Sequence, residues 1–229
     1  MTSLFETSAP LRQGSPNAPA FPCTSLAFVS CYVYSPRAVG AMGEAARLLC
    51  ARVKASDPLW LPRYAGRVCR ATCRDRELAA LFSRGTVLVP VPGSAMTTDG
   101  PWAAERLAHA LQAVGLGQEV WPALRRQVAV RKSATAGVGA RPSVREHYES
   151  LAVVRASGAA ARIVLVDDVI TKGRTLLAAA ARLQGECPNA DIRAFALIRT
   201  SGFVPRLTQF EELRHGVVRW AGGDARREP

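Results

Sequence analysis

Short apolar runs and longer segments of helical periodicity follow one another along most of the chain. Runs rich in β-branched and aromatic residues predict strands, and apolar residues three or four positions apart predict helices. The run 162–167 holds four consecutive apolar residues, which is typical of a parallel strand buried on both faces. The predicted strands are 26–34, 86–91, 119–121, 151–154, 162–167 and 191–198, and the predicted helices are 38–54, 77–82, 101–114 and 175–184.

This order of elements predicts an α/β fold. The strand, helix and strand within 162–198 form a βαβ unit, whose crossover is expected to be right-handed. The segments without such periodicity are a proline-rich start (1–22), a basic connector (63–76), a basic loop with glycines (125–145) and a charged end expected to fray (221–229). We therefore divide the chain into a flexible arm (1–22), an N-terminal extension or hood (23–84), a core (85–210) and a C-terminal segment (211–229).

The composition narrows the class of protein. The chain has 229 residues, 48% of them hydrophobic, which is enough for a buried core. No run approaches the roughly 18 apolar residues of a membrane helix, and no secretory signal is visible, so a cytoplasmic protein is expected. Its six cysteines are then expected to be reduced. The spacing of Cys69 and Cys73 suits a zinc-binding pair, but no second close pair completes a site, and buried free thiols are the alternative.

The formal net charge is +12, from 30 basic and 18 acidic residues. An excess of this size favours anionic partners such as phosphates, nucleotides or nucleic acid. The basic residues are nearly all arginines and alanines are frequent, which is the composition of a GC-rich coding sequence. The arginines also form no single run with interleaved aromatic residues, which weakens the case for a nucleic-acid surface.

One segment, 163–176, joins the clearest strand to a helix through a short loop that suits an anion. In open parallel sheets ligands bind beyond the carboxyl ends of the strands. The start of a helix offers unpaired N–H groups and the positive end of the helix dipole. The loop adds the hydroxyl groups of Thr171 and Thr175, and Gly173 allows its backbone to approach a ligand closely. Phosphate is therefore the expected guest.

Two adjacent carboxylates, Asp167 and Asp168, end the predicted strand. Side chains alternate between the faces of a strand, so these two converge only where the chain curls out of the sheet. There they would accept hydrogen bonds from a vicinal diol such as the 2′- and 3′-hydroxyls of a ribose. A diol acceptor beside a phosphate loop indicates a ribose 5-phosphate. The alternative is that the two acids only form a polar, solvent-facing end to the strand.

This segment resembles the PRPP-binding motif of type I phosphoribosyltransferases: four apolar residues, two acids, two apolar residues and a Thr-x-Gly-x-Thr loop. The resemblance implies a parallel-sheet, Rossmann-like core with a small N-terminal hood, and binding of PRPP with Mg²⁺. It assigns PRPP contacts to Asp167, Asp168, Thr171, Lys172, Gly173, Arg174 and Thr175. Lys172 departs from the motif, which usually has a small residue there. Asp167 and Asp168 are also the candidate residues for Mg²⁺, through PRPP or water.

Two further stretches resemble the ComF branch of this family. Val91, Pro92 and Gly93 match a Val-Pro-Val-Pro-type run that ends a strand at the pyrophosphate loop. The predicted loop 125–145 stands where the family has its flexible catalytic loop, and its candidate pyrophosphate contacts are Arg126, Arg131, Lys132 and Arg141. Lys132 is the candidate lid residue and joins the two aspartates as a catalytic candidate; a solvated surface lysine is the alternative. The four-cysteine zinc module that ComF proteins often carry is missing.

The resemblance implies transfer of phosphoribosyl from PRPP to a nitrogenous acceptor, with release of pyrophosphate. Thr171 stands where purine-specific relatives have an acid, which argues against a 6-oxopurine acceptor. His147 follows the basic loop and is a further candidate for ligand contact. The hood aromatics Tyr32, Tyr34 and Trp60 either contact the acceptor base or cover the sheet.

Two other functions stay open. The chain could be a PRPP- or nucleotide-sensing regulator that kept the pocket without turnover. It could also be a ComF-like accessory protein of DNA uptake or processing, with nucleic acid as a partner. Members of the family are often dimers, so a homodimer is expected by analogy.

Overall fold

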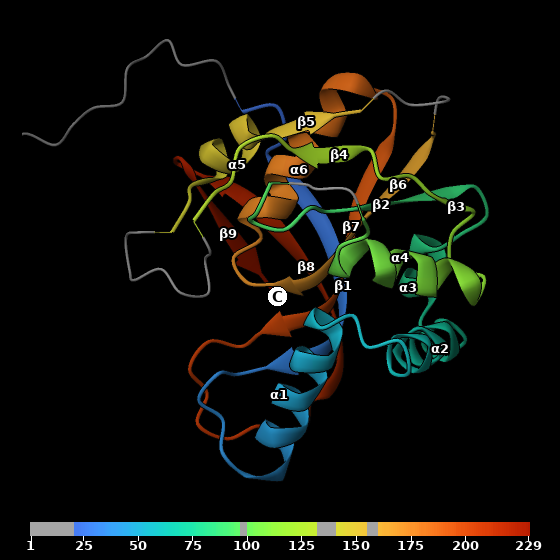
Figure 1. Cartoon of the computed structure of the whole chain (residues 1–229), viewed down its shortest axis with the longest axis vertical. Coiled ribbons are helices and arrows are strands. Elements are labelled where there is room, and N and C mark those ends of the chain that lie inside the picture. The colour runs from blue at the N-terminus through green and yellow to red at the C-terminus, as the bar shows by residue number, and fades with distance from the viewer. Residues whose placement is uncertain (1–20, 97–99, 132–140, 155–159) are drawn as a thin grey trace, which may run out of the picture.

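The structure is a computed structural model that describes residues 21–96, 100–131, 141–154 and 160–229 (Figure 1). The strands in this part of the chain are β1 (Ser25–Tyr34), β2 (Thr86–Pro90), β3 (Glu119–Val120), β4 (Leu124–Arg126), β5 (Leu151–Val153), β6 (Arg162–Ile170), β7 (Asp191–Thr200), β8 (Glu211–Ala221) and β9 (Asp224–Glu228). The helices are α1 (Gly40–Lys54), α2 (Leu61–Thr72), α3 (Arg76–Leu81), α4 (Ala103–Ala113), α5 (Val144–Ser150) and α6 (Arg174–Glu186).

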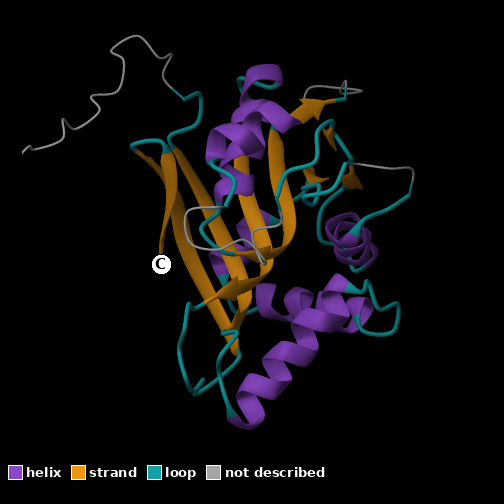
Figure 2. Cartoon of the chain, turned by 60° about the vertical axis from the view of Figure 1, so that its left-hand side comes forward, coloured by secondary structure: helices purple, strands orange, loops and turns teal. Residues whose placement is uncertain are grey.

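Seven of the described strands form one sheet in the order β3-β2-β6-β7-β1-β8-β9. The first five of these run parallel, and β8 and β9 are antiparallel additions at the edge next to β1. A separate antiparallel pair, β4 and β5, lies beside α5 and α6 (Figure 1). The mostly parallel sheet with helices on both faces (Figure 2) confirms the α/β class and is compatible with a Rossmann-like core.

Strand β6 lies inside the sheet, between β2 and β7. Ile163 and Leu165 pack into the core on the α6 side, whereas Val164 and Val166 pack into a second core with residues of α1, α2 and α4. All four side chains are buried, which confirms the two-sided burial expected from the uninterrupted apolar run. The sheet therefore carries β6 through the middle of the molecule and delivers its carboxyl end to the surface.

The prediction of an irregular basic connector over 63–76 is wrong, because α2 occupies most of this segment. Leu61, Tyr64 and Val68 recur at helical spacing and are buried against the second core, while the arginines between them lie on the outer side. The prediction of one long loop over 125–145 is also wrong at both ends. The segment begins within β4 and ends within α5, and its residues 132–140, which include Lys132, lie outside the described residues.

The expectation that 221–229 frays is also wrong, because β8 and β9 form a hairpin there. Its turn uses Gly222 and Gly223, both with positive φ (56° and 102°), a conformation that glycine adopts without a Cβ clash.

The predicted boundary between the hood and the core, at residue 85, divides one continuous sheet, since β1 pairs with both β7 and β8. Of the expected arm, 1–20 lie outside the described residues, and Phe21 is buried and stacked on Trp220, with ring centroids 4.4 Å apart.

Among the described residues, no helix combines the length and the apolar character needed to cross a bilayer. The six cysteines are all unpaired thiols. Cys69 is partly buried on α2, and its thiol lies 3.5 Å from the Val114 carbonyl oxygen, while Cys73 is exposed. Within the described ranges, no three residues of the types His, Cys, Asp and Glu gather as a metal site, so the structure gives the Cys69–Cys73 pair no further ligands.

Candidate functional site

The loop between β6 and α6 has the backbone geometry that a phosphate site needs. Gly173 is the N-cap of α6, with φ +82°, and as a glycine it has no side chain to cap the N–H groups of the first turn. These N–H groups point out of the helix start, where an anion is favoured. A Cβ on Gly173 would lie 2.4 Å from Val218 Cγ2 on β8. Glycine is therefore required at position 173 by the backbone angle and by the close packing against Val218, whether or not a ligand approaches.

A hollow of about 30 Å³ lies at this loop. Its lining residues are Arg141, His147, Asp167, Val169, Ile170, Thr171, Lys172, Gly173, Arg174, Thr175 and Leu176. The hollow is partly open, so a polar group can lie in it and a larger ligand would extend into solvent. The structure thus brings the predicted loop residues together with Asp167, whereas Asp168, Arg126 and the 91–93 segment are not part of the lining.

The two aspartates lie inside β6 rather than at its end, so the expected strand end at residue 167 is wrong by three residues. The register pairs Asp167 with Ala196 and Val169 with Ile198, so the chain stays extended past both acids. Asp167 Oδ1 accepts a hydrogen bond from the Asp168 N–H at 2.9 Å, and Asp168 Oδ1 accepts one from the Val169 N–H at 2.9 Å. Backbone donors therefore orient both carboxylates. The expected curl of the chain out of the sheet at these two acids is wrong, because β6 continues through them. Their side chains still interact, since Asp168 is among the groups that raise the pKa of Asp167.

Burial raises the pKa of Asp167 well above its usual value, and the adjacent Asp168 carboxylate raises it further. The ammonium of Lys54, on α1, lowers that pKa and so acts in the opposite direction. Lys54 is exposed and does not line the hollow, and the sequence did not indicate its influence, because nothing local relates α1 to β6. A half-buried carboxyl with a raised pKa favours a ligand that brings hydroxyl donors or a cation.

The two carboxylates fit Mg²⁺, which typically takes one or two protein carboxylates and completes its shell with water and phosphate oxygens. Asp167 and Asp168 would supply these protein ligands. Because no third acidic or histidine ligand joins them within the described residues, the remaining positions would have to come from the ligand or from water.

Arg126 lies in β4 and is buried, not on a mobile loop. Its guanidinium donates to the carbonyl oxygens of Pro92, at 3.4 Å, and Gly93, and to the Ser150 hydroxyl. Burial lowers the pKa of Arg126 to about 10, and the charge of Asp167 acts against that shift. Arg126 therefore fixes the predicted pyrophosphate segment in place, and this bracing function was not visible in the sequence.

His147, on α5, is buried, and its Nε2 lies 3.5 Å from Thr175 Oγ1. Burial lowers the pKa of His147 to about 4, and the charges of Arg126 and Arg174 lower it further, so the imidazole is neutral near pH 7. The sequence carried a signal for α5: Ser143 and Glu146 form a capping box. His147 thus lies at the hollow beside Thr175, while the expected contact with a ligand stays a prediction.

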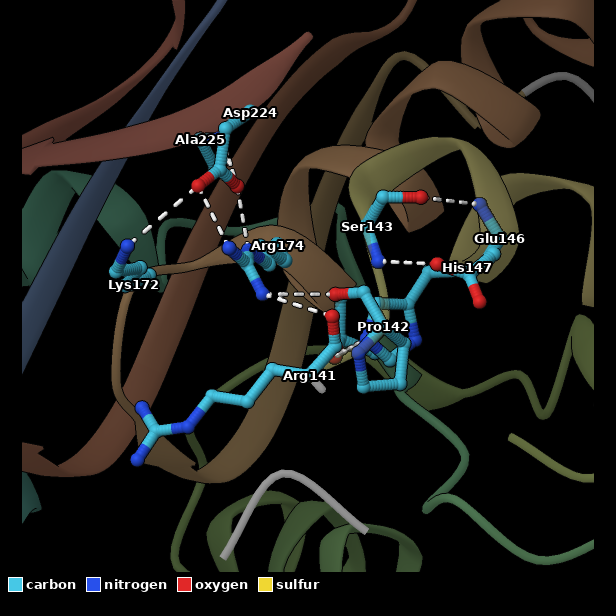
Figure 3. Close-up of polar contacts among 10 residues, drawn as sticks. Arg141, Pro142, Ser143, Glu146, His147, Lys172, Arg174, Asp224 and Ala225 are labelled. Atoms are coloured by element: carbon cyan, nitrogen blue, oxygen red, sulfur yellow. Dashed lines mark hydrogen bonds and ion pairs between the residues drawn. The ribbon is translucent and has the colours of Figure 1, made fainter. Parts of the chain in front are cut away.

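The remaining basic residues around the hollow differ in what they contact (Figure 3). The guanidinium of Arg174 is paired with Asp224 of β9, and Lys172 Nζ lies 3.5 Å from the same carboxylate. Arg131 lies 3.4 Å from Glu146 on an exposed surface. Asp224 could not be found from the sequence, because it stands far from the motif in a segment expected to fray.

The hood aromatics pack against the protein. Tyr32 is buried and meets Tyr64 edge-on, with ring centroids 5.9 Å apart. Trp60 lies under two guanidinium groups, with Arg52 at 3.6 Å and Arg63 at 4.9 Å from its ring. These contacts favour the alternative in which Tyr32 and Trp60 cover the sheet.

No family model matches the chain, and no curated protein matches it in sequence. Fold and site together define an α/β protein with a mostly parallel sheet and, at the carboxyl end of an inner strand, a loop whose geometry suits an anion.

Proposed function

We propose that this chain binds PRPP with Mg²⁺ and transfers its phosphoribosyl group to a nitrogenous acceptor, with release of pyrophosphate. One observation carries the proposal: the motif-like segment 163–176 lies at the carboxyl end of an inner parallel strand, where Asp167 and the loop line one hollow. The proposal includes that the α/β fold is that of a type I phosphoribosyltransferase.

The loop would bind the 5′-phosphate. The unpaired N–H groups at the start of α6 and the hydroxyls of Thr171 and Thr175 supply neutral donors, and the positive end of the helix dipole favours the dianion. Lys172, whose side chain is 54% exposed, adds a cation that can reach the solvent side of the phosphate. The phosphate would lie in the open hollow, and the ribose would extend from it toward β6.

Asp167 and Asp168 would accept hydrogen bonds from the ribose hydroxyls and place C1 for reaction. The C1–O bond to pyrophosphate breaks with its electron pair on the leaving group, and a nitrogen lone pair forms the new C1–N bond as the acceptor loses a proton. When bound, Mg²⁺ would neutralise charge on the pyrophosphate. A bound cation would favour the charged form of Asp167, and negative charge on the aspartates beside the ribose would then favour the positive sugar of the transition state.

The segment 92–93 is the proposed contact for pyrophosphate. Arg126 holds its carbonyl oxygens from a buried position, so the segment keeps its shape without a ligand. A site that is formed in advance loses less entropy on binding.

Calorimetric titration of PRPP with Mg²⁺ tests the binding part of this proposal. We expect the parent to bind and an Asp167→Asn, Asp168→Asn double variant to lose about 100-fold or more in affinity. Asp191→Asn is the matched control, because Asp191 begins β7 at the amino end of the parallel strands, and its side chain forms an exposed pair with Arg193. A folded parent that does not bind PRPP, or a double variant that binds like the parent, would overturn the proposal.

Pyrophosphate release from PRPP, measured with a panel of nitrogenous bases and amines, tests the transfer part. Release that depends on one acceptor and stops in the double variant would support transfer. Binding without release from any acceptor of the panel would favour the sensing function over the enzyme.

A further inference from the structure

The guanidinium of Arg174 joins three separate segments of the chain at the phosphate loop (Figure 3). Its Nε and Nη2 donate to the two carboxylate oxygens of Asp224, and the Nη2–Oδ2 distance is 2.6 Å. Its Nη1 donates to the carbonyl oxygens of Pro142, at 2.9 Å, and Arg141, at 3.4 Å. The side chain is only 17% exposed. All three nitrogens are thus engaged by protein acceptors.

The β8–β9 hairpin that carries Asp224 contacts the loop at two other points. Val218 of β8 fills the space where a Cβ of Gly173 would lie. Arg227 of β9 donates to the Ile170 carbonyl oxygen, at 3.1 Å, and to the Thr200 carbonyl oxygen. The hairpin therefore contacts the residue before the loop, its central glycine and the first residue of α6.

Lys172 and Arg174 differ in how firmly Asp224 holds them. The Arg174 pair is a two-pronged, partly buried contact of the kind that gives a fixed geometry. The Lys172 contact is single, 3.5 Å long and more exposed, so it contributes little and opens readily. A phosphate could recruit the Lys172 ammonium at small cost. Recruiting Arg174 would instead break the two-pronged pair with Asp224 and remove the Arg174 donor from the Pro142 carbonyl. The Asp224 carboxylate would then keep the Ala225 N–H as a donor.

We infer that Arg174 is a positioning residue: through Asp224 the β8–β9 hairpin holds the phosphate loop in its binding shape, and Arg174 itself does not contact the phosphate. The inference rests on the proposed function and corrects the expectation that Arg174 is a direct PRPP contact. It assigns the direct charge contact to Lys172.

Hydrogen exchange of the ligand-free protein tests whether the β8–β9 hairpin stabilises the phosphate loop. In Asp224→Asn and in Arg174→Gln, backbone amides of 170–177 should exchange about tenfold faster than in the parent, and Asp224→Glu should restore most of the protection. Glu228→Gln is the matched control, because Glu228 pairs with Arg219 inside the same hairpin without touching the loop. Unchanged exchange of 170–177 in Asp224→Asn would overturn the inference whether or not any ligand binds.

Titration with ribose 5-phosphate separates positioning from direct contact. If Arg174 positions the loop, Asp224→Asn and Arg174→Gln should each weaken binding about tenfold, and the double variant should be no weaker than either single variant. If Arg174 instead contacts the phosphate, Asp224→Asn should bind as tightly as the parent or more tightly, which would overturn the inference. A parent that does not bind ribose 5-phosphate would contradict the proposed function, while the exchange result would still decide whether the hairpin holds the loop.

Discussion

Two side chains at the hollow, the half-buried Asp167 and the buried His147, are both held toward their neutral forms. Burial raises the pKa of the carboxyl and lowers the pKa of the imidazole, because water is no longer present to solvate the charged form of either. Groups with such opposed shifts commonly mark functional sites, since the cost of burying them is offset only when a ligand arrives. Each shift also makes stability depend on pH in a predictable direction.

Asp167→Asn should stabilise the ligand-free protein while removing ligand binding. The folded-state pKa of Asp167 lies above its ordinary 3.8, so the carboxyl destabilises the fold increasingly as pH rises through that range toward the folded pKa. At about pH 8 the variant should be more stable than the parent by roughly 1 kcal/mol. Urea unfolding at several pH values measures this, with Asp191→Asn as control. Equal destabilisation by Asp167→Asn at every pH would contradict the assignment.

His147 should make the parent lose stability in acid. Its pKa is about 4 in the fold against an ordinary 6.5, so the unfolded chain takes up the proton first and stability falls as pH drops from 6.5 to about 4. The loss from this one group should approach about 3 kcal/mol and be absent in His147→Gln. His109→Gln, on an exposed position of α4, is the control. Parallel stability curves for the parent and His147→Gln would show that the imidazole is not held neutral.

At the scale of elements, the unit β6–loop–α6 could be predicted because its information is local. Four apolar residues define the buried strand, and Gly173 with its flanking threonines defines the turn into α6. The failures have local causes too. Arginines alternate with the apolar residues of α2 and obscure its buried face, and the Gly222-Gly223 turn joins two charged strands that have no apolar run. The capping box of α5 is present in the sequence, inside a basic segment without helical periodicity.

Gly173→Ala tests the geometry of this turn. The left-handed φ costs a residue with a Cβ roughly 1–2 kcal/mol, and the contact with Val218 adds to it, so we expect a loss of more than about 2 kcal/mol together with loss of ligand binding. Gly185→Ala in the same helix is the control: its Cβ meets nothing within 4 Å, and it should be neutral or slightly stabilising. A variant Gly173→Ala as stable as Gly185→Ala would contradict the described turn.

At the scale of the whole molecule, the strand order could not be derived from the sequence. The pairing of β1 with β7 and β8 joins residues far apart in the chain, and no local pattern encodes it. The same holds for the contacts that shape the site from outside the motif: Arg126 at the 92–93 segment and Asp224 at Arg174. The sequence therefore indicated the chemistry of the loop, whereas the residues that hold it emerged only from the fold.

The recognition of a ribose by the two aspartates is the centre of this account. The most direct measurement compares the dissociation constants of ribose 5-phosphate and 2-deoxyribose 5-phosphate, which differ by one hydroxyl. The parent should prefer the ribose compound by about ten- to hundred-fold, the value of one hydrogen bond to a charged acceptor. The Asp167→Asn, Asp168→Asn variant should lose that preference. Equal affinity of the parent for both sugars, or no binding of either by the folded chain, would contradict the account.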